Sequence, residues 1–241
     1  MGATPASDSV SALAADLRRR SAANPALAPF ADHLDGVDRS SARFARARPC
    51  THPTMAHLGP ALAAAAGEPR LLAATRVVAD AVNWYQIYQG EGVDPGLAEG
   101  MLAGQIAGQV GILASDTLRT GLFLLAPGLH YPLHTHGAAE IYYCMSGRLT
   151  MQHGTAATPF DLRPGDCSVT PPNRLHSLDT GEAPVLLLYV WTGDVDAPNW
   201  WWERRPEGGW LRVNWSRTPD GSWARIRAEA VTEAHLRQAN G

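Results

Sequence analysis

Between residues 117 and 195 the chain alternates short runs of Leu, Val, Tyr and Thr with turns rich in Gly and Pro, and this spacing restricts the fold most strongly. The turns read APGLH, MSGRL, RPGDC and TPPN. Several short strands at such spacing are typical of an antiparallel sandwich or barrel and not of a parallel sheet. We therefore expect an antiparallel β-barrel in this part of the chain.

The residues before about position 107 follow a helical spacing instead, since apolar side chains recur there every three or four residues. Ala-rich segments end at Gly67 and at Gly90, as helices commonly do. The change of period predicts three parts: a helical N-terminal region (1–110), a β-barrel that carries the functional site (111–197) and a C-terminal extension (198–241). We expect the helices to pack on the outside of the barrel and to help close its mouth.

The C-terminal extension contains six of the eight Trp residues of the chain and ends in a polar segment, ARIRAEAVTEAHLRQAN, for which we expect a helix. Aromatic-rich segments usually cover the edge of a core or a subunit interface, and less often form a ligand cage. We therefore interpret the extension as a structural cover, and a homodimer stays open.

Composition limits the partners and the compartment. A net charge of −3 and a pI near 6.3 give no electrostatic reason to expect nucleic acid or a membrane surface as a partner. Neither a signal peptide nor a membrane span is visible. Three cysteines without a CxxC pair are typical of free thiols in a reducing compartment, so we expect a cytoplasmic protein that acts on a small molecule.

The chain has no Lys, and all twenty basic residues are Arg. A Schiff base with a substrate carbonyl or with pyridoxal phosphate requires a Lys amine, and so does a phosphate-binding loop of the Gly-Lys-Ser kind. Any demanding chemistry must therefore come from other groups.

Such groups are concentrated in GLHYPLHTHGAAEIYYCMSG, residues 128–147. His134 and His136 are two residues apart in an extended run, so their imidazoles leave the same face of a strand. Glu140 and Tyr142 share the parity of the next run, and His176 comes from another expected strand. The sequence thus predicts that these side chains converge on one point.

Imidazoles and a carboxylate in this arrangement suit a first-row divalent metal, and four protein ligands leave room for water or substrate. A single strand histidine more often lies at the surface or satisfies a core hydrogen bond, but four convergent side chains favour a metal. We predict one divalent ion per chain, bound by His134, His136, Glu140 and His176. The ligand set leaves Zn, Fe and Mn open.

The same stretch resembles the first motif of the cupin family, which reads Gly, five residues, His-x-His, three or four residues, Glu, six residues, Gly. Every fixed position is present, as Gly128, His134, His136, Glu140 and Gly147. The resemblance implies a mainly β fold, a double-stranded β-helix or jelly-roll barrel, which the helices precede here.

The second cupin motif is similar to GDCSVTPPNRLHSLDT, with Gly165, Pro171 and His176 in place. The chain departs from it at Asn173, where the family usually has Gly, and at Thr180, where Asn is usual. Neither position is a ligand in the family, so the implied metal site is unaffected. A cupin fold hosts many reactions, however, and the motifs alone do not choose one.

A narrower resemblance is to the cupin-type dimethylsulfoniopropionate (DMSP) lyases, carried by HYPLHTHGAAEIYY, VWTGD and NWYQIY. It implies a metal-dependent β-elimination that gives acrylate and dimethyl sulfide. It also implies that Tyr131 and Tyr142 belong to the inner shell of the site, and that an aromatic residue like Trp191 lines the pocket.

That elimination needs a base for the proton α to the carboxylate, and the candidates are Tyr142, Tyr131 and a histidine not bound to metal. A free phenol with a pKa of about 10 is mostly protonated at neutral pH, and a nearby cation stabilises its phenolate. We expect Tyr142 to be the base, with Tyr131 as the second candidate.

A sulfonium has no hydrogen-bond donor, so the pocket should offer aromatic faces. The candidates are Trp191, Trp84, Tyr85 and Tyr88.

Two other classes of function stay open. The same ligands would serve another small-molecule cupin enzyme, such as a sugar isomerase or a dioxygenase, and they would also serve a cupin that binds a ligand without catalysis. We treat His130 as no more than a support for the ligands. The remaining histidines lack partners at ligand spacing and are expected to be structural: His33, His52, His57, His153 and His235.

Overall fold

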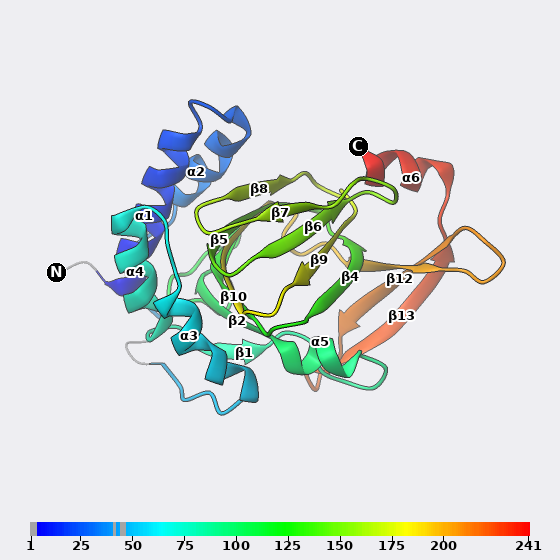
Figure 1. The fold of residues 1–241 in the computed structure, drawn as a ribbon, viewed down its shortest axis with the longest axis horizontal. Helices are drawn as coiled ribbons and strands as arrows, with labels where there is room; N and C mark the ends of the chain where they lie inside the picture. The colour runs from blue at the N-terminus through cyan, green and yellow to red at the C-terminus, as the bar shows by residue number, and fades with distance from the viewer. Residues whose placement is uncertain (1–3, 41, 44–46) are drawn as a thin grey trace.

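The computed structural model describes residues 4–40, 42–43 and 47–241 and consists of two facing antiparallel sheets, with the helices of residues 5–79 on one side (Figure 1). The first sheet has the strand order β1-β2-β3-β10-β5-β8, and the second has the order β13-β12-β11-β4-β9-β6-β7. The prediction of a mainly β, jelly-roll-like cupin fold preceded by helices is confirmed.

The strands are β1 (Trp84–Gln86), β2 (Met101–Ala107), β3 (Leu118–Leu125), β4 (His130–Thr135), β5 (Ala138–Ser146), β6 (Leu149–His153), β7 (Phe160–Leu162), β8 (Cys167–Thr170), β9 (His176–Thr180), β10 (Val185–Gly193), β11 (Asn199–Arg204), β12 (Trp210–Arg217) and β13 (Trp223–Ala230). The helices are α1 (Pro5–Arg20), α2 (Ala28–Asp35), α3 (Leu58–Ala63), α4 (Pro69–Ala79), α5 (Pro95–Gly100) and α6 (Glu233–Asn240), with 3₁₀ turns η1 (Pro25–Leu27) and η2 (Pro53–His57). No helix among the described residues is long and apolar enough to cross a membrane.

The first sheet separates two hydrophobic cores because successive side chains of a strand point to opposite faces. On β5, Ile141 and Tyr143 pack in the core beneath the helices, whereas Tyr142 and Cys144 pack in the core between the two sheets. Helices α1–α4 therefore cover the outer face of the first sheet.

Helix α1 is fixed to the barrel by its Arg20, whose guanidinium pairs with the buried Asp16 of the same helix. Its Asp16 accepts hydrogen bonds from Arg19 and Arg20 at 2.5 and 2.6 Å. Arg20 also donates to the Tyr143 hydroxyl at 2.9 Å and to the Gly165 carbonyl at 2.8 Å, so it links the helix to the barrel at two points. Tyr143 is thus a packing residue on the outer face, in agreement with its opposite parity to Tyr142.

The expectation of helical structure to about residue 107 is wrong for two segments. Residues 84–86 form β1 and residues 101–107 form β2, and the two strands pair with each other at the edge of the first sheet. All seven residues of β2 are buried. A strand covered on both faces has a continuous apolar run, which periodicity cannot tell from a buried helix.

The C-terminal extension continues the second sheet. β11 pairs with β4, and β12 and β13 follow in order beyond it. The expected helix over 224–240 is confirmed only for residues 233–240, where Thr232 caps α6, because residues 223–230 form β13. Apolar and charged residues alternate strictly in ARIRAEA, residues 224–230, which is the period of two of a strand and which the expectation of a helix overlooked.

We predict that Leu17→Ala destabilises the protein through the core beneath the helices. Leu17 is fully buried in that core, and truncation of a buried Leu typically costs about 2–5 kcal/mol. Urea unfolding measures the change, and Val77→Ala on the exposed face of α4 is the control, since Val77 is 56% exposed. Equal stabilities for the two variants would contradict the assignment of α1 to the core.

Candidate metal centre and active site

The four predicted ligands converge between the two sheets. His134 comes from β4, His136 follows its end, Glu140 comes from β5 and His176 begins β9. All four are at most 2% exposed. The candidate ligand nitrogens of the three histidines lie within 4.8 Å of one another, a separation that one ion can bridge.

Backbone carbonyl groups fix the tautomer of each imidazole. The Nδ1 atoms of His134, His136 and His176 lie 2.7, 3.0 and 2.9 Å from the carbonyl oxygens of Pro132, Ala138 and Arg174. Because a carbonyl only accepts, each Nδ1 carries the proton and each Nε2 keeps its lone pair. This is the usual support of a metal-binding histidine.

Two further observations fit a divalent cation. His176 Nε2 is buried without a hydrogen-bond partner among the described residues, which is costly unless something binds it. Glu140 Oε2 lies 3.2 Å from His136 Nε2 and 3.3 Å from His176 Nε2, so the carboxylate faces the same point. The donor set of three imidazoles and one carboxylate suits a first-row metal.

The electrostatics favour the metal-binding protonation states of His134 and Glu140. Burial, and then the neighbouring His176 and His136, lower the pKa of His134 well below its usual value, so the imidazole is neutral. Burial acts to raise the pKa of Glu140, but His136 and His176 outweigh it and lower that pKa well below the usual value. A neutral imidazole and an ionised carboxylate are the forms that bind metal.

Two tyrosines adjoin the ligands. The Tyr131 ring stacks on the His134 ring with 3.9 Å between centroids, and its hydroxyl forms a hydrogen bond with the hydroxyl of Tyr88. Tyr142 lies two residues beyond Glu140 on the same face of β5. Burial first, and then Glu140, raise the pKa of Tyr142 well above 10, and burial and Tyr88 do the same for the pKa of Tyr131. Both phenols are therefore protonated in the metal-free chain.

The four aromatic pocket candidates divide between the two cores. Trp191 lies at the site, stacked on His136 with 4.3 Å between ring centroids, and Tyr88 reaches the site through Tyr131. Tyr85 faces the same core more remotely. Trp84 lies in the other core, where its indole N–H donates to the Ala79 carbonyl. The cause is strand geometry, since Trp84 and Tyr85 are adjacent in β1 and must point to opposite faces.

Trp201 is a residue that sequence reasoning missed. It pairs with His134 across β11 and β4, and its ring lies 5.2 Å from that of Tyr88 and 6.3 Å from that of Tyr131. Trp223 packs in the same core, and its indole N–H donates a hydrogen bond to the Ile87 carbonyl at 2.6 Å. Alternation along a strand places only the middle Trp of WWW, Trp201, on the inward face. This signal could be used only if β11 was recognised as a strand.

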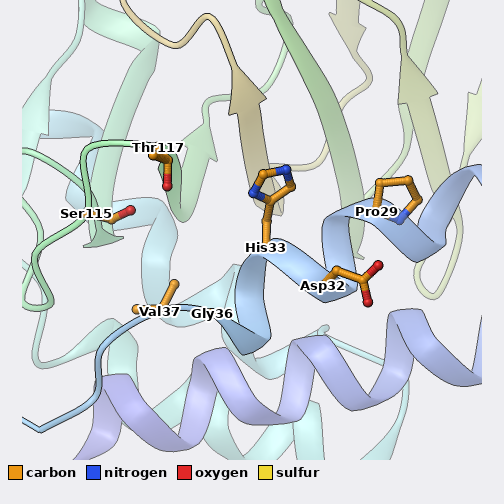
Figure 2. Close-up of a pocket in the computed structure, with 7 residues that line it drawn as sticks. All are labelled: Pro29, Asp32, His33, Gly36, Val37, Ser115 and Thr117. Carbon is orange, nitrogen blue, oxygen red and sulfur yellow. The ribbon is translucent and has the colours of Figure 1, made fainter.

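The other histidines stay outside the ligand set. His130 is exposed and pairs with Asp179 at 2.7 Å, so it does not support the ligands. His153 is partly buried and hydrogen-bonded to Thr170 at 3.3 Å, and its ring centroid is 6.4 Å from that of His176. His33 lines a surface cleft of about 330 Å³ beside α2, drawn in Figure 2, which shares no lining residue with the ligand cluster.

The two departures from the second motif have structural explanations. Asn173 adopts a positive φ of 61°, which Gly accepts freely and Asn tolerates better than most residues. The Thr180 hydroxyl donates to the Ala126 carbonyl at 2.7 Å and accepts from the Leu129 amide at 2.8 Å. It therefore ties the turn before β4 to β9.

The jelly-roll sheets and the buried histidine cluster at their centre define this protein as a cupin. A sequence profile of the DMSP lyase family matches residues 14–187, which is most of the chain. The chain therefore belongs to the DMSP lyase family.

Individual relatives agree with this assignment. The chain is 30% identical over 115 residues to the dimethylsulfoniopropionate lyase DddQ of Ruegeria pomeroyi, a match of 47% of this chain and 56% of that relative. It therefore spans only about half the length of the characterised protein. The crystal structure of Ruegeria pomeroyi DddQ superposes with a TM-score of 0.60 and 25% identity, over 79% of this chain and 94% of that one.

A second solved structure, described as that of the DMSP lyases RdDddP and RnDddQII, superposes with a TM-score of 0.58. It covers 79% of this chain and 96% of that one at 22% identity, and at that identity it supports the fold alone.

We predict that the purified protein binds about one divalent ion per chain and that His176→Ala loses most of it. The variant removes the imidazole whose Nε2 is buried without a partner. Elemental analysis after dialysis measures the metal content, with His130→Ala as the exposed control. Binding of an ion at 100 times its Kd stabilises a folded protein by about 2.7 kcal/mol, so a chelator should lower the Tm of the wild type more than that of His176→Ala. Equal metal content in all three proteins would refute the ligand set.

Proposed function

We propose that this protein is a metal-dependent lyase that cleaves DMSP by β-elimination to acrylate and dimethyl sulfide. The observation that carries the proposal is a buried site of three imidazoles and one carboxylate, with Tyr142 and Tyr131 beside it, in a chain of the DMSP lyase family. The name of the Ruegeria pomeroyi relative supports the same reaction.

His134, His136, Glu140 and His176 are the proposed ligands of one Zn, Fe or Mn ion. A bound divalent cation supplies positive charge that stabilises the enediolate formed when the α-proton of the substrate leaves. The burial of the four side chains excludes water from this region, which strengthens every electrostatic interaction there.

Tyr142 is the proposed base. It shares the inward face of β5 with Glu140, so its hydroxyl lies on the ligand side of the sheet. As the phenolate it accepts the α-proton, the C–H electron pair forms the double bond of acrylate, and the C–S electron pair leaves with dimethyl sulfide. Tyr131 is the second candidate, because its ring stacks on the imidazole of the proposed ligand His134.

Aromatic faces are proposed to hold the sulfonium group. The rings of Tyr131 and Trp191 each stack on a ligand histidine, and Tyr88 lies behind Tyr131. A cation without hydrogen-bond donors is attracted to such faces by cation–π interaction. Trp84 is not part of this proposal because it lies in the other core.

Headspace detection of dimethyl sulfide tests the proposal directly. We expect purified protein to release it from DMSP after reloading with Zn, Fe or Mn, and not in the metal-free form. Tyr142→Phe should reduce the rate by roughly 10²–10⁴-fold, the usual contribution of a general base. Tyr143→Phe is the matched control, since its hydroxyl faces Arg20 in the outer core. Release retained in Tyr142→Phe and lost in Tyr131→Phe would move the base to Tyr131. No release with any metal would refute the lyase.

A pH dependence follows from the raised pKa of Tyr142. Because the base acts only when deprotonated and burial and Glu140 hold its pKa high, the active fraction increases as the pH rises. We expect kcat/KM to rise through about pH 7 to 9, below the pKa of about 10 of a free phenol, and Tyr142→Phe to lose that slope. A rate that falls over this range would contradict Tyr142 as the base.

A further inference from the structure

Trp191 and Glu140 are direct cross-strand partners, which places the indole beside the carboxylate. The register pairs Trp191 of β10 with Glu140 of β5, although the two residues are 51 positions apart. Paired residues of an antiparallel ladder share one face and lie within about 5.5 Å of each other at Cβ. Contact between the two side chains is therefore built into the sheet.

The contact uses one carboxylate oxygen and leaves the other. The Trp191 indole N–H donates a hydrogen bond to Glu140 Oε1. Oε2 is the oxygen that lies 3.2 and 3.3 Å from the Nε2 atoms of His136 and His176. A carboxylate free to rotate could present either oxygen, or both, to an ion. The indole bond selects Oε2.

The same indole also restrains a second ligand. Its ring stacks on the His136 imidazole at 4.3 Å between centroids, with 29° between the planes. His136 Nδ1 donates to the Ala138 carbonyl on the far side from its ligand atom. One face of the Trp191 ring thus packs against a candidate ligand side chain. A residue that only lined the substrate pocket would not need this contact.

We propose that Trp191 is a positioning residue of the metal centre, which fixes Glu140 with Oε2 toward the imidazole nitrogens. The inference rests on the metal site proposed above but not on its substrate. Residues that hydrogen-bond to metal ligands commonly contribute about 10- to 100-fold in metal affinity, because they orient the ligand before the ion binds.

Metal affinity in a double-mutant cycle tests the inference. The variants are Trp191→Phe, Glu140→Gln and the double variant, and the Kd for Zn is measured by competition with a chelating dye. Trp191→Phe should weaken binding by about 10- to 100-fold. If Trp191 acts through Glu140, the double variant should bind almost as Glu140→Gln alone does, since coupled residues are not additive.

Trp84→Phe is the matched control. Trp84 also has a satisfied indole N–H, bonded to the Ala79 carbonyl at 2.9 Å, but on the opposite side of the sheet. Its affinity for Zn should equal that of the wild type. The absorption spectrum of the Co-loaded protein is a second readout, and Trp191→Phe should change it while Trp84→Phe should not.

A subtler variant separates the hydrogen bond from the ring. Benzothienylalanine at position 191 keeps the shape of Trp but has sulfur in place of the N–H, so it preserves stacking on His136. We expect this variant to reproduce most of the loss seen with Trp191→Phe. Unchanged affinity in both variants, or effects that add fully to that of Glu140→Gln, would overturn the proposal. Because no readout requires DMSP, a failed lyase assay leaves the test intact.

Discussion

The hydrogen bonds from three imidazole Nδ1 atoms to backbone carbonyl groups are the constraint on which the site depends. Each bond joins a histidine to a carbonyl two residues away, at Pro132, Ala138 and Arg174. They fix the tautomers before any ion binds and orient the three Nε2 lone pairs inward. The fold therefore provides an organised set of donors, at the cost of burying polar atoms that need a partner.

The two cores on either side of the first sheet separate the residues that stabilise the fold from those that carry the chemistry. The helices bury the outer face of the first sheet, and the candidate ligands and tyrosines lie on its inner face and on the second sheet. Along β5 the alternation is direct, since Tyr143 bonds to Arg20 of α1 while its neighbours Tyr142 and Cys144 face the inner core. Substitutions in the core beneath the helices should thus lower the stability of the fold more than they disturb the candidate metal ligands.

The sequence predicted the convergence of His134, His136, Glu140 and His176 because a period of two and the cupin spacing are both local signals. It did not predict the bond between Trp191 and Glu140, since that depends on the register between two distant strands. β2 was missed because burial on both faces removes alternation. The inward position of Trp201 was missed because β11 was not recognised as a strand, although its pairing with β4 brings Trp201 beside His134.

The most direct test of the four-residue metal site is the location of the ion, from anomalous scattering at the metal absorption edge in crystals of the metal-loaded protein. We expect one ion per chain at about 2.0–2.2 Å from the Nε2 atoms of the three histidines and from Glu140 Oε2. An ion bound through Nδ1, or a site that excludes Glu140, would contradict it.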